Sequence, residues 1–207
     1  MRIMFTHLAV LAFLFVEPSL CFSEASCREL KHTTPERMVE YLQQSTGALS
    51  QTCVAYAIDE LGSRKHVAAA EILTKYLDFP RPGTELNGRT NVIVRIPWLG
   101  DYYPAVDALF EIGRPAIPSL IRVLGAGGTS DLARRNAVGV VGAVFRDNVV
   151  DAVVLLNDAN RSAEDPGVAG RLLDAAKQMV KECPGSVQPR CQAVLWNQVR
   201  IVSGHKQ

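Results

Sequence analysis

The chain has 207 residues, of which 48% are hydrophobic and 21% charged, and its 22 basic and 21 acidic side chains give a formal net charge of +1 at pH 7. So balanced a charge argues against a protein that binds nucleic acid through a basic surface. So high an apolar content argues against a disordered chain. The length fits one domain, or at most two small ones, with a hydrophobic core.

The N-terminal residues have the three-part pattern of a secretory signal peptide. A basic residue precedes a nine-residue apolar core at 8–16, and small residues follow at Ser23 and Ala25. The apolar core is too short to span a bilayer of about 30 Å. We expect cleavage after Ser23, with cleavage after Ala25 as the alternative. Residues 1–23 are then a signal peptide, and residues 24–207 form the mature chain.

Two other interpretations of the N-terminus stay open. In the first, Cys21 carries a lipid anchor, although Leu20 before it is bulkier than the residue expected there. In the second, the apolar segment is a buried N-terminal helix of the mature fold. No other segment is long and apolar enough to span a membrane. We therefore expect an exported protein, periplasmic or secreted, whose mature chain does not insert into the membrane.

Cleavage would remove Cys21 and leave four of the five cysteines in the mature chain. An even number of cysteines in an exported chain predicts two disulfides. Three pairings are possible, and proximity in sequence favours Cys27 with Cys53 and Cys183 with Cys191. The cysteines and histidines lack the short spacings of a zinc site. We expect no metal and no cofactor.

Helical periodicity dominates the mature chain, with apolar residues at steps of three and four and short turns between the periodic segments. Capping signals mark helix starts, as at Thr34, Pro35 and Asp101. Glycines mark helix ends, as at Gly62 and Gly125. The pattern predicts about nine helices and little strand. The helices are expected over residues 35–42, 50–61, 67–77, 102–113, 115–124, 130–144, 148–156, 165–183 and 187–202.

Three segments share the pattern Ala-apolar-x-x-apolar-Gly, followed by a turn and a second apolar helix. They end at Gly62, Gly113 and Gly142, and the last two glycines lie 29 residues apart. A single helix pair of this kind cannot bury its own apolar face, whereas stacked pairs share a continuous core. The repeated pattern therefore predicts a solenoid of stacked helix pairs.

The segment from Ala105 to Leu124, AVDALFEIGRPAIPSLIRVL, resembles a HEAT repeat, and more narrowly the short bacterial HEAT-like repeats. The resemblance extends from about Val54 to Leu156. It implies an all-α fold, an α-α superhelix of antiparallel helix pairs within residues 24–207. It implies no particular activity, because such repeats occur in scaffolds, adaptors, assembly factors and some enzymes. Export and disulfides point away from the cytoplasmic chromophore lyases that carry some of these repeats.

An insertion at about 79–101 interrupts the repeats and is rich in turn-forming Pro and Gly. Long loops on a scaffold often carry function, and Arg, Trp and Tyr are enriched at binding hot spots. An alternative is that the apolar residues of the insertion only cover the solenoid between imperfectly stacked repeats. If the insertion binds a partner, the residues expected to contact it are Arg89, Arg95, Trp98, Tyr102 and Tyr103.

The sequence contains no evident catalytic arrangement. Asp107 and Glu111 lie four residues apart on one predicted helix face, a spacing typical of a solvated surface. Asp147 and Asp151 share that spacing, and His66 fits a turn or a helix start. We therefore expect a non-enzymatic scaffold or adaptor that binds another protein of the envelope or exterior. The alternatives are an enzyme or small-ligand carrier that uses the concave groove of the solenoid, and a purely structural role in a larger assembly.

Overall fold

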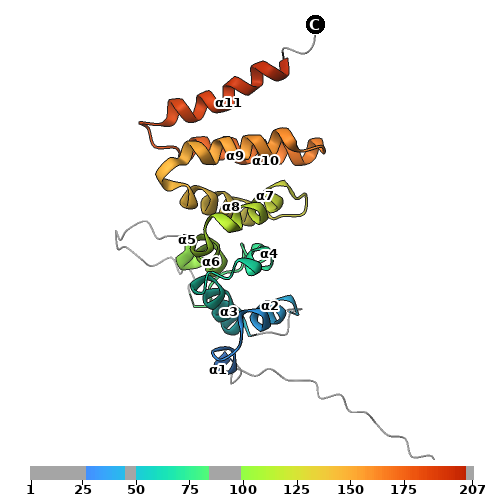
Figure 1. The fold of residues 1–207 in the computed structure, drawn as a ribbon, viewed down its shortest axis with the longest axis vertical. Helices are drawn as coiled ribbons and strands as arrows, with labels where there is room; N and C mark the ends of the chain where they lie inside the picture. Colours follow the sequence, from blue (N-terminus) through green and yellow to red (C-terminus); the bar gives the residue numbers. More distant parts are fainter. Residues whose placement is uncertain (1–26, 45–49, 84–98, 204–207) are drawn as a thin grey trace, which may run out of the picture.

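The computed structural model describes residues 27–44, 50–83 and 99–203 (Figure 1). All regular elements in these ranges are helices, and they stack in layers along the long axis of the molecule from α1 to α11. The fold is therefore all-α, an α-α superhelix, as the periodicity predicted. The predicted signal peptide at 1–23 lies outside the described residues.

Eleven α-helices and three short 3₁₀ helices occur in the described ranges. The α-helices are α1 (Cys27–Leu30), α2 (Pro35–Gln43), α3 (Gln51–Ser63), α4 (Ala70–Thr74), α5 (Leu99–Tyr102), α6 (Pro104–Ile112), α7 (Ile117–Gly125), α8 (Asp131–Val144), α9 (Val149–Ser162), α10 (Pro166–Glu182) and α11 (Gln188–Ser203). The 3₁₀ helices are η2 (Val67–Ala69), η3 (Arg114–Ala116) and η4 (Arg146–Asn148).

Helix starts follow the capping chemistry that the sequence predicted. At the start of α2, the Thr34 hydroxyl accepts a hydrogen bond from the backbone N–H of Arg37 at 3.5 Å. At the start of α10, the Asp165 carboxylate accepts one from the backbone N–H of Val168 at 2.8 Å. Each bond satisfies one of the N–H groups that the first helical turn leaves without a partner.

Three predicted boundaries are wrong. The helix expected over 67–77 is a 3₁₀ turn followed by α4, which ends at Thr74. Asp101 does not cap a helix, because it lies within α5, and the N-cap residue of α6 is Tyr103. Pro104 at the first helical position sets this start, because an α-helix accommodates proline without disruption only in its first turn. Helix α9 continues to Ser162 rather than ending at Leu156, and it packs along α10.

Three consecutive units each consist of a helix, a 3₁₀ turn and a second helix: α3–η2–α4, α6–η3–α7 and α8–η4–α9. The turns of the last two units begin at Arg114 and Arg146, 32 residues apart, so the predicted step of 29 residues is wrong. At the 32-residue step, the fully buried Leu109 of α6 corresponds to the fully buried Val141 of α8. Gly142, expected at a turn, lies inside α8. A shift of about one helical turn keeps the apolar residues on the same face, so the sequence pattern alone did not distinguish the two steps.

The helices stack in two columns. Helices α3, α6 and α8 pack in succession in one column, and α2, α4, α7 and α10 pack in succession in the other (Figure 1). In a regular stack, α7 would be followed in its column by α9, which is the second helix of the next repeated unit. Here α10 follows α7 instead. One hydrophobic core runs through both columns, from Leu30 near the N-terminal end to Cys191 in α11.

Two disulfides close the ends of the stack, with the pairing that sequence proximity favoured. Cys27 and Cys53 join α1 to α3 with Cα atoms 5.1 Å apart. Cys183 and Cys191 join the end of α10 to α11 with Cα atoms 6.8 Å apart. Among the helices of the described ranges, none combines the length and the hydropathy needed to cross a bilayer.

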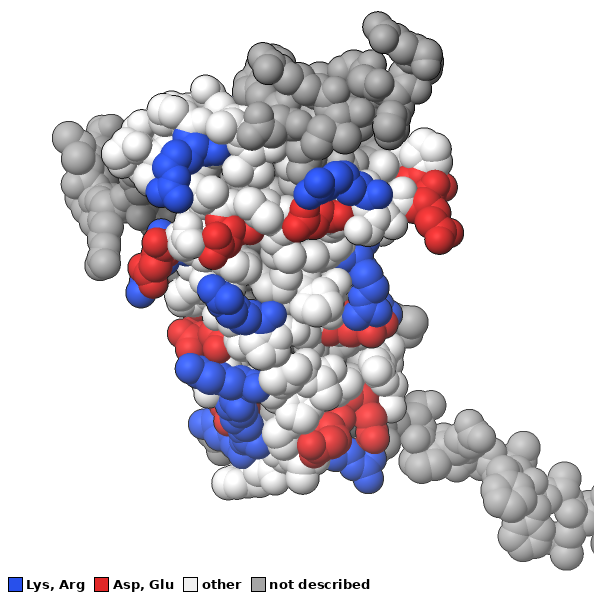
Figure 2. Space-filling view, turned by 45° about the horizontal axis from the view of Figure 1, so that its top comes forward, with Lys and Arg blue, Asp and Glu red and all other residues white. Residues whose placement is uncertain are grey.

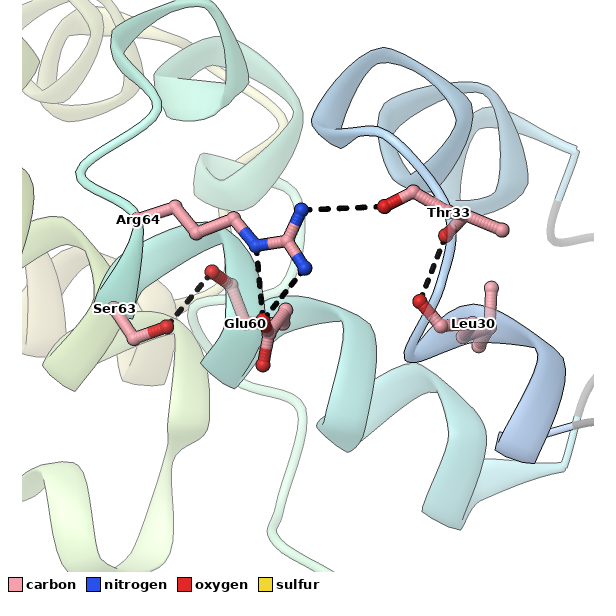
Figure 3. A network of polar contacts seen from close by, with 5 residues as sticks. All are labelled: Leu30, Thr33, Glu60, Ser63 and Arg64. Atoms are coloured by element: carbon pink, nitrogen blue, oxygen red, sulfur yellow. Dashed lines mark hydrogen bonds and ion pairs between the residues drawn. The ribbon is translucent and has the colours of Figure 1, made fainter.

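Arg64 connects the turn that follows α1 to α3 (Figure 3). Its guanidinium binds the Glu60 carboxylate, with the Nη2–Oε1 distance at 2.7 Å, and donates from Nη1 to the Thr33 carbonyl at 3.2 Å. The Thr33 hydroxyl in turn donates to the Leu30 carbonyl at 2.8 Å. These bonds and the α1–α3 disulfide hold α1 against the N-terminal end of the solenoid.

Candidate partner-binding site

The inserted segment predicted at about 79–101 is described at its two ends. The first end is the turn that follows α4 and reaches Gly83, and the second end is α5, which begins at Leu99. The backbone N–H of Arg81 donates to the carbonyl of Tyr102 at 2.7 Å. The two ends of the segment therefore meet beside α6.

Arg81 also fixes the first end to α3. Its two terminal nitrogens donate to the two carboxylate oxygens of Asp59 at 2.6 and 2.8 Å, and both side chains are partly buried. Such a bidentate pair is among the stronger side-chain contacts and sets the orientation of both groups. These hydrogen bonds raise the pKa of the Arg81 guanidinium against the opposing effect of burial, and the charges of Asp59, Asp107 and Asp101 raise it further.

The second end of the segment rests on α8. A Cβ atom placed on Gly139 would lie 2.8 Å from Cδ1 of Leu99, so this glycine leaves the space that Leu99 occupies. The side chain of Leu99 is 37% exposed. Helix α5 thus leaves some apolar surface open to solvent next to the segment.

The structure describes two of the five residues that we predicted to contact a partner. Tyr102 is half-buried and gives its carbonyl to the junction of the two ends. Tyr103 is half-buried against the hydrophobic core, so packing occupies part of its ring. Arg89, Arg95 and Trp98 lie outside the described residues. The structure adds Arg81 to these residues, because Arg81 anchors the segment through its ion pair with Asp59 of α3.

The two carboxylates that the sequence placed on one face of α6 have different surroundings. Asp107 is half-buried and lies within electrostatic reach of Arg81. Glu111 is exposed and lies 3.8 Å from the ammonium group of Lys65. A lysine therefore accompanies one carboxylate and an arginine the other, which is typical of a solvated helix face.

The remaining titratable candidates are also dispersed. Asp147 and Asp151 are exposed on η4 and the first turn of α9. His66 is the N-cap residue of η2, which confirms the predicted helix start. In the part of the chain that the structure describes, no group of three His, Cys, Asp or Glu residues could hold a metal ion. Figure 2 shows acidic and basic side chains interspersed over the face in view, so neither charge dominates that face.

The structure also contains a groove that the sequence did not predict. A groove of about 500 Å³ opens where α7, α9 and α10 meet. Its walls include apolar side chains of α7 and α10, among them Ile121, Val168 and Leu172. The sequence assigned the residues of α10 to a helix with one apolar face and residues 125–128 to a turn. It could not show the groove, because the groove depends on α10 following α7 in its column.

Comparison of the chain with protein-family models, with curated proteins and with solved structures finds no match in any of the three. The class of the protein is therefore defined by its fold, an all-α superhelix with two disulfides. Its assignment to the HEAT-like repeats stays a prediction from the sequence pattern.

Proposed function

We propose that this protein is an exported, non-enzymatic HEAT-like solenoid that acts as a scaffold or adaptor and binds another protein of the cell envelope or exterior through its inserted segment. The observation that carries the proposal is the anchoring of that segment. Arg81 binds Asp59 of α3 through two hydrogen bonds and Tyr102 of α5 through its backbone. Both ends of the segment are thus attached to the solenoid.

The anchoring favours binding because the ends of a recognition segment need not be ordered again when the partner arrives. Ordering a loop costs free energy that is subtracted from the affinity. The residue types between the ends are those enriched in hot spots, with Arg89, Arg95 and Trp98 in the segment and Tyr102 at its border. We infer that Trp98 provides the apolar anchor and that the arginines supply charged contacts around it.

Two observations support export. The described residues contain two disulfides, and disulfides form and persist mainly in oxidising compartments. The N-terminal residues have the pattern of a signal peptide, which would direct the chain out of the cytoplasm. We propose a periplasmic or secreted location for the mature chain.

The experiment is affinity purification from the native envelope after chemical cross-linking, with residues 24–207 as the bait. Trp98→Ala removes the proposed anchor. Trp196→Ala is the matched control, because Trp196 is the other tryptophan of the chain and lies in α11, outside the segment. We expect one stoichiometric protein partner with the wild type and with Trp196→Ala, and none with Trp98→Ala.

Circular dichroism and the thermal midpoint establish that each bait is folded before the comparison. A folded Trp98→Ala bait that recovers the same partner in the same amount would refute the proposed surface. A wild-type bait that recovers no protein partner under conditions in which the cross-linker acts would refute the scaffold function.

A further inference from the structure

The groove between α7, α9 and α10 offers a second surface, on helices other than those that hold the described ends of the inserted segment. Ile121 of α7, Ala163 just after α9, and Val168 of α10 line it and are half-buried, so they leave apolar area open to solvent. The groove has a volume of about 500 Å³ and is largely open to solvent, so a partner's side chain can lie in it without being enclosed.

A positively charged guanidinium is fixed at the edge of the groove. The Nε atom of Arg171 donates to the carbonyl of Gly125, a lining residue, at 2.6 Å. A Cβ atom placed on Gly127 would lie 3.9 Å from both terminal nitrogens of Arg171, so this group lies over the turn that follows α7. Among the described residues, no carboxylate forms an ion pair with Arg171.

The other charged side chains of the described residues near the groove form no ion pair with Arg171. Arg122 is the one charged residue among those that line the groove, and it lies 3.4 Å from Glu71. Both side chains are more than 60% exposed, so solvent screens this ion pair and it contributes little to stability. The Asp165 carboxylate caps α10 and keeps its negative charge. It lies near Arg171, because a Cβ atom placed on Gly167 would be 3.0 Å from Asp165 Oδ1 and 3.3 Å from Arg171 Nη1, but it accepts no hydrogen bond from that guanidinium. Asp158 pairs with Arg161. The groove therefore combines an apolar floor with a cationic edge.

We propose that the groove binds a segment of a protein partner that places an aliphatic or aromatic side chain next to an Asp or Glu side chain. The apolar side chain enters the groove, and the carboxylate takes the two terminal nitrogens of Arg171. A guanidinium fork matches a carboxylate in geometry and charge. Because Gly125 already holds Nε, little side-chain freedom is lost when the carboxylate binds.

The turn after α7 leaves room for a carboxylate on an internal residue of a partner chain. Gly127 and Gly128 have no side chains, and a Cβ atom placed on Gly128 would meet nothing within 4 Å. A partner chain can therefore continue past Arg171 over this turn. The same geometry does not require a chain to end at that point.

The test is selection of a library of random 12-residue peptides, displayed with both ends joined to the carrier, against the protein with intact disulfides. Ala126→Trp blocks the groove, because Ala126 is an exposed lining residue just after α7. Ala193→Trp is the matched control on the exposed face of α11. We expect the enriched peptides to share an apolar residue next to Asp or Glu. They should bind the wild type and Ala193→Trp equally, and bind Ala126→Trp at least about tenfold more weakly.

A double-mutant cycle then tests the contact with Arg171 and separates it from a structural role. The carboxylate of the enriched peptide is replaced by the amide in one arm, and Arg171→Met is made in the other. Each change should weaken binding about tenfold, and the amide peptide should lose nothing further on Arg171→Met. Arg146→Met removes a 75% exposed arginine of η4 and should leave the affinity unchanged.

Several outcomes would overturn the proposal. They are enriched peptides without an acidic residue, equal binding to Ala126→Trp, and additive losses in the cycle. Enrichment that appears only when the peptides have a free C-terminus would assign the groove to chain ends instead. Retention of a small apolar molecule by the wild type but not by Ala126→Trp in native mass spectrometry would assign it to a carrier function. None of these results depends on Trp98, so the proposed role of the inserted segment is tested separately.

Discussion

Gly62 allows a close contact between two helices of the solenoid to be tested directly. It lies in α3 where that helix packs against α6. A Cβ atom placed on Gly62 would lie 2.4 Å from the Cα and 2.6 Å from the Cβ of Ala108. Because the obstacle is backbone, no rotation of a side chain can relieve it. Gly62→Ala must therefore push α3 and α6 apart.

The expected magnitude follows from two opposing effects. Alanine in place of glycine inside a helix normally stabilises a protein by about 0.5–1 kcal/mol. Forcing extra volume into a packed interface typically costs about 1–3 kcal/mol. We expect Gly62→Ala to lower the free energy of unfolding by about 1–2 kcal/mol in net terms. Gly170→Ala is the matched control, because Gly170 lies inside α10 with nothing within 4 Å of its Cβ position. It should raise the free energy of unfolding by about 0.5–1 kcal/mol.

Urea unfolding followed by far-ultraviolet circular dichroism, with the disulfides intact, measures both variants. The two variants should shift the unfolding transition in opposite directions from the wild type. In a thermal scan of a chain of this length, each 1 kcal/mol corresponds to a shift of about 2–4 °C in the thermal midpoint. Gly139→Ala should fall between them, because its Cβ position meets only the end of the Leu99 side chain. A stabilised Gly62→Ala protein would refute the close approach of α3 and α6.

Three further predictions concern side-chain contacts and the disulfides. In a double-mutant cycle, Arg81→Met and Asp59→Asn should show a coupling energy of about 1 kcal/mol in urea unfolding, since the pair is bidentate but partly exposed; additive effects would contradict the pair. Asn136→Ala should cost about 1–3 kcal/mol by thermal unfolding, because the buried Asn136 amide donates to a backbone carbonyl after α4 at 2.7 Å, whereas Asn148→Ala, at an exposed position without a capping bond, should cost far less. Replacing both cysteines of the α1–α3 disulfide by alanine should cost about 1 kcal/mol more than the same change at the α10–α11 disulfide, because the closed loops span 26 and 8 residues; equal losses would argue against control by loop entropy.

Local chemistry accounts for the features of the fold that could be predicted from the sequence. The caps at Thr34 and Asp165 depend on residues three positions away, and a short chain segment contains the whole interaction. The disulfides followed from sequence proximity for a similar reason. All-α packing followed from apolar periodicity that recurs along the mature chain. Each of these predictions needed only neighbours in sequence.

The features that the sequence did not reveal depend on contacts between distant segments. The sequence marks Gly62 as the end of a helix, but Gly62 lies within α3. Its missing side chain leaves the space that Ala108 of α6 occupies. Arg81 lies within the predicted insertion, and nothing in the local sequence indicates that it pairs with Asp59 in α3. The groove has the same origin, because it requires α10 to follow α7. Tertiary contacts of this kind leave no periodic signal.

The described ends of the inserted segment and the groove are held by different helices, and this arrangement bears on how two sites would work together. The ends of the inserted segment are anchored through α3, α5 and α8, whereas the groove is formed by α7, α9 and α10 (Figure 1). The core between the columns is continuous and closely packed, and such interiors deform little. Occupation of one surface should therefore leave the affinity of the other unchanged, as for distant sites that share no contacts. A scaffold with two independent sites can hold two partners at once and bring each to a high effective concentration near the other.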